Sequence, residues 1–217
     1  MRGHHPAIHG EFAVPPQILD YSDYHRTVIG YHGTDAQTAE RLVAGESFKI
    51  SEADDEWFGS GYYFWEHAYK QAWWWARDHK KHSAPAVVGA VIRLGNCFDL
   101  VDPVNVLVFR AFLDEMVKDL NANDLRVPKN VRTHRNLDCA VFNHLYNEFK
   151  EAKKPLDTAR AVYVPTGSKK RVCKGSWLSE ETHIQLCVRT ETSILAVWHV
   201  REDGRYGKGG QHPAGGD

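Results

Sequence analysis

Strand-forming segments lie at both ends of this chain and helical segments lie between them, and this order constrains the fold more than any other feature. A β-rich run occupies residues 27–32, and three further apolar runs occupy residues 161–164, 183–188 and 194–200. Strands so far apart in sequence form a sheet only by pairing across the helical middle of the chain. The sequence therefore predicts an α+β fold with non-local strand pairing.

The middle of the chain predicts four helices and one buried strand. Thr34 and Gln37 have the spacing of a capping box, so the first helix is expected to follow Thr34 and to end at Gly45. The other predicted elements are helices over 66–81, 103–120 and 137–150 and a strand over 87–92.

The composition is that of one globular domain with little net charge. The 217 residues are 42% hydrophobic and 25% charged, with a net charge of −1. These values exclude wholesale disorder and a duplex-binding charge spread over the whole molecule. We expect an arm over 1–16, one domain over 17–201 and a glycine-rich tail over 202–217. No apolar run is long enough to span a bilayer, which predicts a cytoplasmic protein without membrane contact.

The cysteines and histidines do not have the spacing of a disulfide framework or a metal site. The cysteines stand at 97, 139, 173 and 187, far apart and without a Cys-x-x-Cys pair. The nearest approach to ligand spacing, His79 and His82, encloses two lysines and no carboxylate or thiol. We expect reduced thiols and no metal.

The first candidate functional segment is His32-Gly33-Thr34, where a predicted strand meets a helix. Hydrogen-bond donors gather at such a junction, and a glycine lets a ligand approach the backbone. The alternative interpretation is a purely structural turn.

The second candidate segment is Gly59-Ser60-Gly61-Tyr62-Tyr63-Phe64, and the helix predicted after it carries Trp73, Trp74 and Trp75. Successive side chains on a helix point about 100° apart, so a single core face does not take all three indoles. One of them is expected to line a cleft or an interface. The alternative is that all three are wedged between sheet and loop.

The third candidate segment is the predicted strand over 183–188. Strand alternation puts Glu181, His183, Gln185 and Cys187 on one face and the aliphatic residues on the other. The polar face either is exposed to solvent or borders a wet cleft.

These three segments, in this order, resemble the motifs of the poly-ADP-ribose-polymerase-like ADP-ribosyltransferases over roughly residues 28–200. The resemblance implies a split antiparallel β-sandwich with flanking and inserted helices, and NAD⁺ as the ADP-ribose donor. Bacterial proteins with similar motifs include toxins and phage-defence effectors, which implies such a role and, for a toxin, an inhibitory partner.

The resemblance also implies which residues bind NAD⁺. His32 matches the residue that binds the adenine ribose, and the Gly33 backbone matches the one that holds the nicotinamide amide. Tyr63 and Trp74 match the two rings that sandwich nicotinamide. The implied binding set is His32, Gly33, Thr34, Tyr63, Trp74 and Lys70.

The implied catalytic set is His32, Tyr63, Gln185 and Glu66. Gln185 stands where the family has a glutamate. A neutral amide binds a ribose hydroxyl but neither stabilises a developing cation as a carboxylate does nor acts as a base, which favours single ADP-ribose transfer over chain elongation. Glu66 and Glu181 are the candidates for the missing carboxylate, although an acid in a first helical turn also simply favours the helix dipole.

The expected acceptor is a macromolecule, either RNA, single-stranded DNA or protein. Two cation clusters would steer a nucleic acid, or else are solvated loops: Arg126, Lys129, Arg132 and Arg135, and Lys169, Lys170, Arg171 and Lys174. Three functions remain open: an ADP-ribosyltransferase, an NAD⁺ glycohydrolase on the same scaffold, and a catalytically inactive module that binds NAD or nucleic acid.

Overall fold

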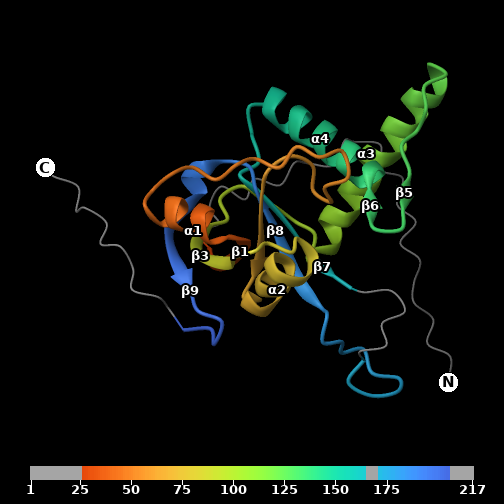
Figure 1. The fold of residues 1–217 in the computed structure, drawn as a ribbon. Coiled ribbons are helices and arrows are strands. Elements are labelled where there is room, and N and C mark those ends of the chain that lie inside the picture. Colours follow the sequence, from red (N-terminus) through yellow and green to blue (C-terminus); the bar gives the residue numbers. More distant parts are fainter. Residues whose placement is uncertain (1–25, 165–170, 206–217) are drawn as a thin grey trace, which may run out of the picture.

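The computed structural model describes residues 26–164 and 171–205. It has seven strands in one sheet, a two-stranded ribbon and several helices (Figure 1). The predicted arm over 1–16, most of the predicted tail, and Lys169 and Lys170 lie outside the described residues.

The fold is α+β, as predicted, and it is built on a large, mostly antiparallel sheet of strand order β4-β7-β8-β2-β1-β3-β9. These strands are β1 (Thr27–Asp35), β2 (Tyr62–Glu66), β3 (Pro85–Arg93), β4 (Cys97–Asp99), β7 (Thr158–Tyr163), β8 (His183–Val188) and β9 (Ile194–Val200). The ribbon pairs β5 (Asn130–Val131) with β6 (His134–Arg135). Only the β4–β7 pair is parallel among the described strands.

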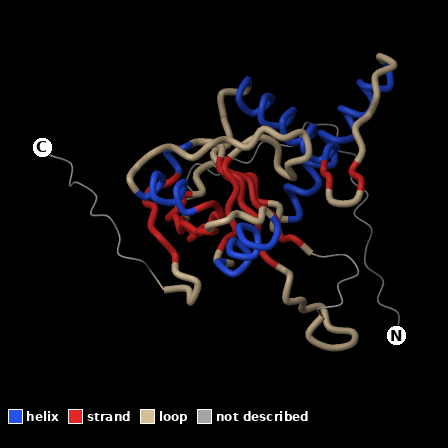
Figure 2. The backbone as a smooth tube through the Cα atoms, in the orientation of Figure 1, coloured by secondary structure: helices blue, strands red, loops and turns tan. Residues whose placement is uncertain are grey.

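Helices lie on both sides of this sheet (Figure 2). They are α1 (Ala36–Val43), α2 (Tyr69–Trp74), α3 (Pro103–Ala122) and α4 (Asn136–Glu151). A π-helical turn, η1 (Trp75–His79), continues α2, and a 3₁₀ turn, η2 (Glu191–Ser193), precedes β9. The strands predicted at both ends of the chain and the helices predicted near 103–120 and 137–150 are thereby confirmed.

The two faces of the sheet have different covers. On one face, α1 packs its Leu42 against a cluster that contains Phe64 and Leu186, and we call this the α1 face. On the other face, α4 packs its Phe142 and Leu145 against the strand that carries Cys187, and α3 packs against α4. We call this second side the α4 face; α2 covers another part of it.

Two local predictions are wrong, both at strand–helix junctions. β1 continues through Thr34, and Asp35 caps α1 instead, because its carboxylate accepts from the Thr38 N–H at 2.9 Å. Glu66 is the last residue of β2 and does not begin a helix. Its carboxylate is held by Arg160 on β7, a partner that no local pattern reveals.

Candidate functional site

The sheet is split between β1 and β2. On its other edge β1 pairs with β3 over nine residue pairs, from Thr27–Arg93 to Asp35–Pro85. Against β2 it makes two pairs, Gly30–Glu66 and Tyr31–Trp65. Beyond Tyr31 the two strands separate, and β2 continues its ladder on the other side with β8 over five pairs. The split therefore begins at His32, the first residue of the first candidate segment.

The backbone of Gly33 faces this split. The Ile29 carbonyl accepts from the His67 N–H on the β2 side, and backbone groups along a strand alternate in direction. The N–H and C=O of Gly33 therefore point toward β2, where pairing has ended. A continued sheet would give the Tyr63 carbonyl to the Gly33 N–H. Here that carbonyl accepts a hydrogen bond from a side chain instead. The Gly33 N–H therefore points into the split without its ladder partner.

The side chain that bonds to the Tyr63 carbonyl is that of His32, whose Nδ1 lies 2.9 Å from the carbonyl oxygen. A carbonyl only accepts, so Nδ1 carries the proton and Nε2 keeps its lone pair. Burial lowers the pKa of His32 below its usual 6.5, while the carbonyl partly opposes this shift. The ring packs edge-on against Phe48 at 5.5 Å and near Phe64 at 5.8 Å. His32 is thus a fixed, neutral imidazole on the α1 face, with an acceptor at Nε2.

Gly33 is also required for packing. A Cβ at this position would lie 2.2 Å from the carbonyl oxygen of Ala72 in α2. The glycine therefore lets the backbone of α2 approach β1 on the α4 face. The sequence predicted ligand access at this glycine, and the structure adds a helix contact to the same residue.

Tyr63 and Gln185 share the α4 face. Tyr63 pairs with Cys187 and Trp65 pairs with Gln185, so Tyr63 and Gln185 are diagonal neighbours, about 7–8 Å apart by strand geometry. The Tyr63 hydroxyl donates to the Gly59 carbonyl at 2.6 Å and accepts from the Phe58 N–H at 3.0 Å. Burial raises the pKa of this phenol, so it stays protonated. Tyr63 is a fixed ring, not an acid or a base.

Gln185 lies between the two apolar clusters of this face. One contains Phe142 and Cys187 and the other contains Trp65 and Ala72, while Gln185 belongs to neither. Within the described part of the chain its side-chain amide makes no hydrogen bond. Burial raises the pKa of the neighbouring Cys187 to about 12, so no thiolate competes there. Gln185 is thus a polar side chain on this face without a hydrogen bond in the described ranges, and its register with Cys187 confirms the predicted strand alternation.

Glu66 lies on the opposite face from Gln185. Both of its carboxylate oxygens accept from Arg160 Nη1, at 2.7 and 2.6 Å, and the two side chains are each 8% exposed. Arg160 Nε also donates to Asp99 at 2.9 Å, and Asp99 pairs with Arg26. Glu66 is therefore the end of a buried ion-pair network that joins β2, β7 and β4, and we leave it out of the catalytic set.

The three consecutive tryptophans divide between core and surface. Trp73 and Trp75 pack into the cluster beside Trp65, whereas Trp74 is 45% exposed. The Trp74 ring contacts His79 at 5.7 Å, and among the described residues it makes no ring contact with Tyr63. Lys70 is exposed. A single core face does not take all three indoles, as expected, and Trp74 and Lys70 lie toward solvent. That Trp74 lines a cleft or an interface stays a prediction.

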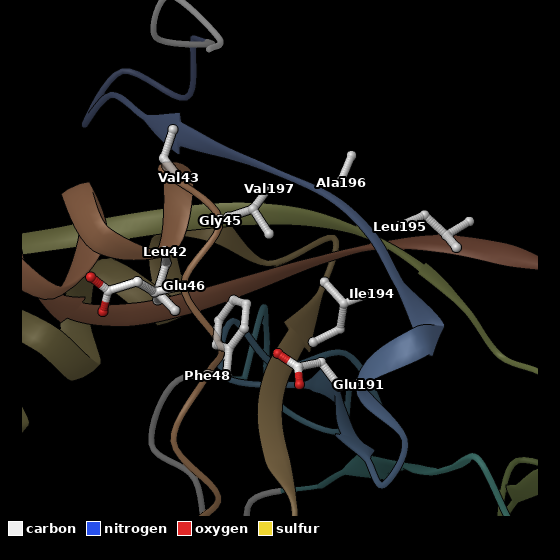
Figure 3. Close-up of a pocket in the computed structure, with 10 residues that line it drawn as sticks. All are labelled: Leu42, Val43, Gly45, Glu46, Phe48, Glu191, Ile194, Leu195, Ala196 and Val197. Carbon is white, nitrogen blue, oxygen red and sulfur yellow. The ribbon is translucent and has the colours of Figure 1, made fainter. Parts of the chain in front are cut away.

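A cavity on the α1 face was not predicted from the sequence (Figure 3). It measures about 180 Å³ and is lined by Leu42, Val43, Gly45, Glu46, Phe48, Glu191, Ile194, Leu195, Ala196 and Val197. Phe48 both lines the cavity and touches His32. Two carboxylates, Glu46 and Glu191, stand among apolar walls. Only the loop after α1 hinted at this site, because an isolated phenylalanine follows its glycine and glutamate.

The described residues contain no group of three or more potential metal ligands. None of the helices in the described ranges is long and apolar enough to cross a lipid bilayer.

Comparison with known proteins gives one informative match. The chain is similar to the uncharacterized protein MJ0359 of Methanocaldococcus jannaschii, with 28% identity over 191 residues, covering 79% of this chain and 87% of that protein. No family model matches the chain, and no solved structure matches it. The candidate site therefore rests on its own geometry.

Proposed function

We propose that the protein transfers one ADP-ribose unit from NAD⁺ to a macromolecule, on the split-sheet scaffold that its motifs resemble. The observation that carries this proposal is the split at His32. There β1 presents a backbone donor at Gly33 and a neutral acceptor at His32 Nε2, β2 presents Tyr63, and the next strand, β8, presents Gln185. These are donors and acceptors for a dinucleotide that lies across the sheet.

The adenosine half of NAD⁺ fits the α1 face. His32 Nε2 would accept a ribose hydroxyl. Thr34, a largely buried residue on the same side of β1, has a hydroxyl without a partner in the described ranges. The adenine ring would enter the cavity beyond Phe48. Its exocyclic amino group donates, and Glu46 and Glu191 supply acceptors at the rim.

The nicotinamide half fits the α4 face. The Gly33 N–H would donate to the carboxamide oxygen. The Tyr63 ring, which stacks on Phe58 at 6.3 Å with one side, would give its other side as a flat apolar surface. Gln185 binds a hydroxyl of the adjoining ribose. Because Trp74 points to solvent and contacts His79, we assign the nicotinamide stacking to Tyr63 alone.

The reaction breaks the bond between the ribose C1′ and the nicotinamide nitrogen, and nicotinamide leaves with the bonding electron pair. A nucleophilic atom of the acceptor bonds to C1′ and releases its proton to solvent. The site contributes orientation and hydrogen bonding to a cation-like transition state. With Gln185 neutral and Glu66 paired with Arg160, no carboxylate of this set activates an ADP-ribose hydroxyl, which favours a single transfer.

The first test is incubation with labelled NAD⁺, with and without cell lysate. We expect label on a macromolecule and released nicotinamide. Free ADP-ribose alone would make the protein an NAD⁺ glycohydrolase, and intact NAD⁺ would leave it a binding module. We also propose that the protein acts in the cytoplasm as a toxin or phage-defence effector restrained by an inhibitory partner, and label on lysate components would support the effector role alone.

Variants then test the site. Tyr63→Ala should abolish nicotinamide release with a retained circular dichroism spectrum, because its ring is proposed to stack on the leaving group. Gln185→Ala should cut the rate strongly, and Gln185→Glu should keep much of it, because the carboxylate accepts the same hydroxyl. Gln37→Ala, the same change on the exposed surface of α1, is the control. A Gln185→Ala protein with wild-type turnover would remove β8 from the site.

A further inference from the structure

The end of α2 and the turn after it form a surface that combines aromatic rings with positive charge. We call this the α2 surface and define it by Lys70, Trp74, His79, Lys80 and Lys81, all of which are exposed. It is distinct from the cation clusters expected from sequence, and the NAD⁺ site described above does not use it.

The rings of the α2 surface are held in place. His79 stacks on Trp75 with ring centroids 4.1 Å apart and planes 16° apart, and Lys80 Nζ lies 5.1 Å from the centre of the Trp75 ring. Trp74 borders His79 and leaves 45% of its surface open. The π turn over Trp75–His79 brings these side chains together, and such turns occur frequently at functional sites.

The charge of this segment is almost entirely positive. Between His67 and His82 the sequence has four cations, Lys70, Arg77, Lys80 and Lys81, and one acid, Asp78. Asp78 is paired with Arg77, whose Nε donates to Asp78 Oδ2 at 3.2 Å. Arg77 Nη1 also lies 2.6 Å from Glu202 Oε1. The three lysines therefore face solvent without a carboxylate partner in the described part of the chain.

The mixture of groups favours a nucleic acid over a protein surface. Trp74 is the only large hydrophobic side chain of residues 67–82 that is exposed, and no aliphatic side chain accompanies it. Lone aromatic rings among lysines match bases that stack and phosphates that pair, whereas protein contacts also need aliphatic area. A ring can stack only on an unpaired base, so the strand must be single.

We propose that the acceptor is a single-stranded nucleic acid, RNA or DNA, that binds the α2 surface through a base on Trp74 and phosphates on Lys70, Lys80 and Lys81. The idea that this strand is the acceptor rests on the proposed function. It also has a geometric basis, because α2 packs its Ala72 carbonyl against Gly33 and so joins this surface to the split. The binding itself requires no NAD⁺.

The first experiment measures binding alone. Fluorescein-labelled 12-mers of uridine and of thymidine, and a 12-base-pair duplex, are titrated with the full chain without NAD⁺, and anisotropy is recorded between 50 and 200 mM salt. We expect single strands to bind more tightly than duplex, with affinity that falls as salt rises. Equal or tighter binding of duplex, or no binding of either single strand, overturns the proposal.

Substitutions at Trp74 separate stacking from apolar contact. Trp74→Leu should weaken binding about tenfold, whereas Trp74→Phe should retain most of it, because only a ring stacks on a base. Equal losses for Leu and Phe, or none, overturn the stacking contact. Because Trp74 is half exposed, we expect both variants to keep the wild-type melting temperature, and this comparison accompanies the titration.

Charge variants localise the surface. Lys80→Ala/Lys81→Ala should lower the slope of log affinity against log salt by about 1.4, or about 0.7 for each phosphate that no longer pairs with a lysine. Lys118→Ala/Lys150→Ala makes the same change in net charge on exposed positions of α3 and α4 and should leave the slope unchanged. Equal effects of the two double variants contradict the assignment to the α2 surface.

Labelled NAD⁺ added to the bound oligonucleotide then tests the acceptor. Label on the oligonucleotide, reduced by Trp74→Leu, supports the proposal. NAD⁺ turnover with label only on protein overturns the acceptor assignment and leaves the proposed transferase intact. Intact NAD⁺ would contradict the proposed function and the acceptor role together, while the anisotropy result would still decide whether the surface binds single strands.

Discussion

Strand β1 has two neighbours and pairs with them very differently. Against β3 every residue of β1 is in register, and the backbone groups on that edge are used by the ladder. Against β2 the ladder ends after Tyr31, so the other edge of the same strand is open from His32 onward. Both edges carry the same kind of backbone. The difference is that the backbone groups of β1 that face β3 are used in the ladder, whereas those that face β2 after Tyr31 are not.

This difference shows how a sheet is opened without losing its register. The Tyr63 carbonyl, which would continue the ladder, is satisfied by the His32 imidazole at 2.9 Å. Just before β2 begins, Gly61 pairs with Ser51 in an isolated bridge, with N–O distances of 3.0 and 2.9 Å in the two directions. The Tyr63 carbonyl and the backbone of Gly61 therefore have partners, whereas the Gly33 N–H on β1 is left facing the split.

The largest expected effect comes from the network that holds β2 beside the point where the split begins. Arg160→Met leaves Glu66 and Asp99 without their shared buried cation, which should cost about 3–5 kcal/mol of unfolding free energy. Urea unfolding followed by circular dichroism measures this loss. Arg77→Met removes an exposed pair with Glu202 and should cost less than about 1 kcal/mol. Similar losses for the two variants would mean that the network does not secure β2.

The next effect compares two glycines of β1. Gly33→Ala puts a Cβ 2.2 Å from the Ala72 carbonyl, a backbone atom that moves only with α2, and should cost about 3 kcal/mol. Gly30→Ala lies in the paired part of the strand and meets the end of the Ile92 side chain at 2.6 Å and Phe64 Cβ at 3.0 Å. These are side-chain atoms that shift more easily than a helix backbone, so the change should cost about 1–2 kcal/mol. Thermal unfolding ranks the two. If Gly30→Ala is the more damaging change, α2 does not rest on the backbone at Gly33.

The order of these elements could be read from the sequence, but the split could not. Alternation in the strand from His183 to Val188 predicted that Gln185 and Cys187 share a face, and hydrophobic spacing predicted α4 within one residue of its ends. These are local signals. The sequence predicted that Glu66 begins a helix. Local patterns did not reveal its place at the end of β2, because its partner, Arg160, lies 94 positions away.

The candidate site was predictable residue by residue but not in its arrangement. The sequence indicated His32, Gly33 and Tyr63, yet nothing in it indicated that the His32 ring and Tyr63 lie on opposite faces of the sheet. Nor did it reveal the cavity behind Phe48. Both depend on where the pairing of β1 with β2 stops, which is a property of the assembled sheet.

A smaller effect is expected in binding. His32→Ala removes the bridge to Tyr63 and the acceptor at Nε2, and should weaken NAD⁺ affinity about tenfold, within the 1–3 kcal/mol of an unsatisfied partner. Isothermal titration calorimetry measures this change. The control is His199→Ala. His199 lies on β9, beyond β3 and away from the split, and its Nε2 is 3.4 Å from an exposed Glu40 carboxylate, so this change should leave NAD⁺ affinity unchanged. Unaltered affinity in His32→Ala would make the split a structural feature without a role in NAD⁺ binding.

The smallest expected effect is the pH dependence of stability that the split introduces. Burial lowers the pKa of His32 in the folded protein below 6.5, so below pH 6.5 the unfolded chain binds a proton that the folded chain does not. Stability is therefore fully present above about pH 6.5 and falls as the pH drops toward the lowered pKa, with a limiting slope of about 1.4 kcal/mol per pH unit. His183, whose pKa is lowered mainly by burial, contributes with the same sign.

Urea unfolding of wild type, His32→Asn and His183→Asn at pH 7.5, 6.5 and 5.5 separates the two contributions. We expect each variant to flatten the acid limb, because asparagine takes up no proton in this range. If His32→Asn keeps the full wild-type slope, the imidazole is already accessible to protons in the folded state and is not the fixed neutral acceptor inferred from its bond to Tyr63.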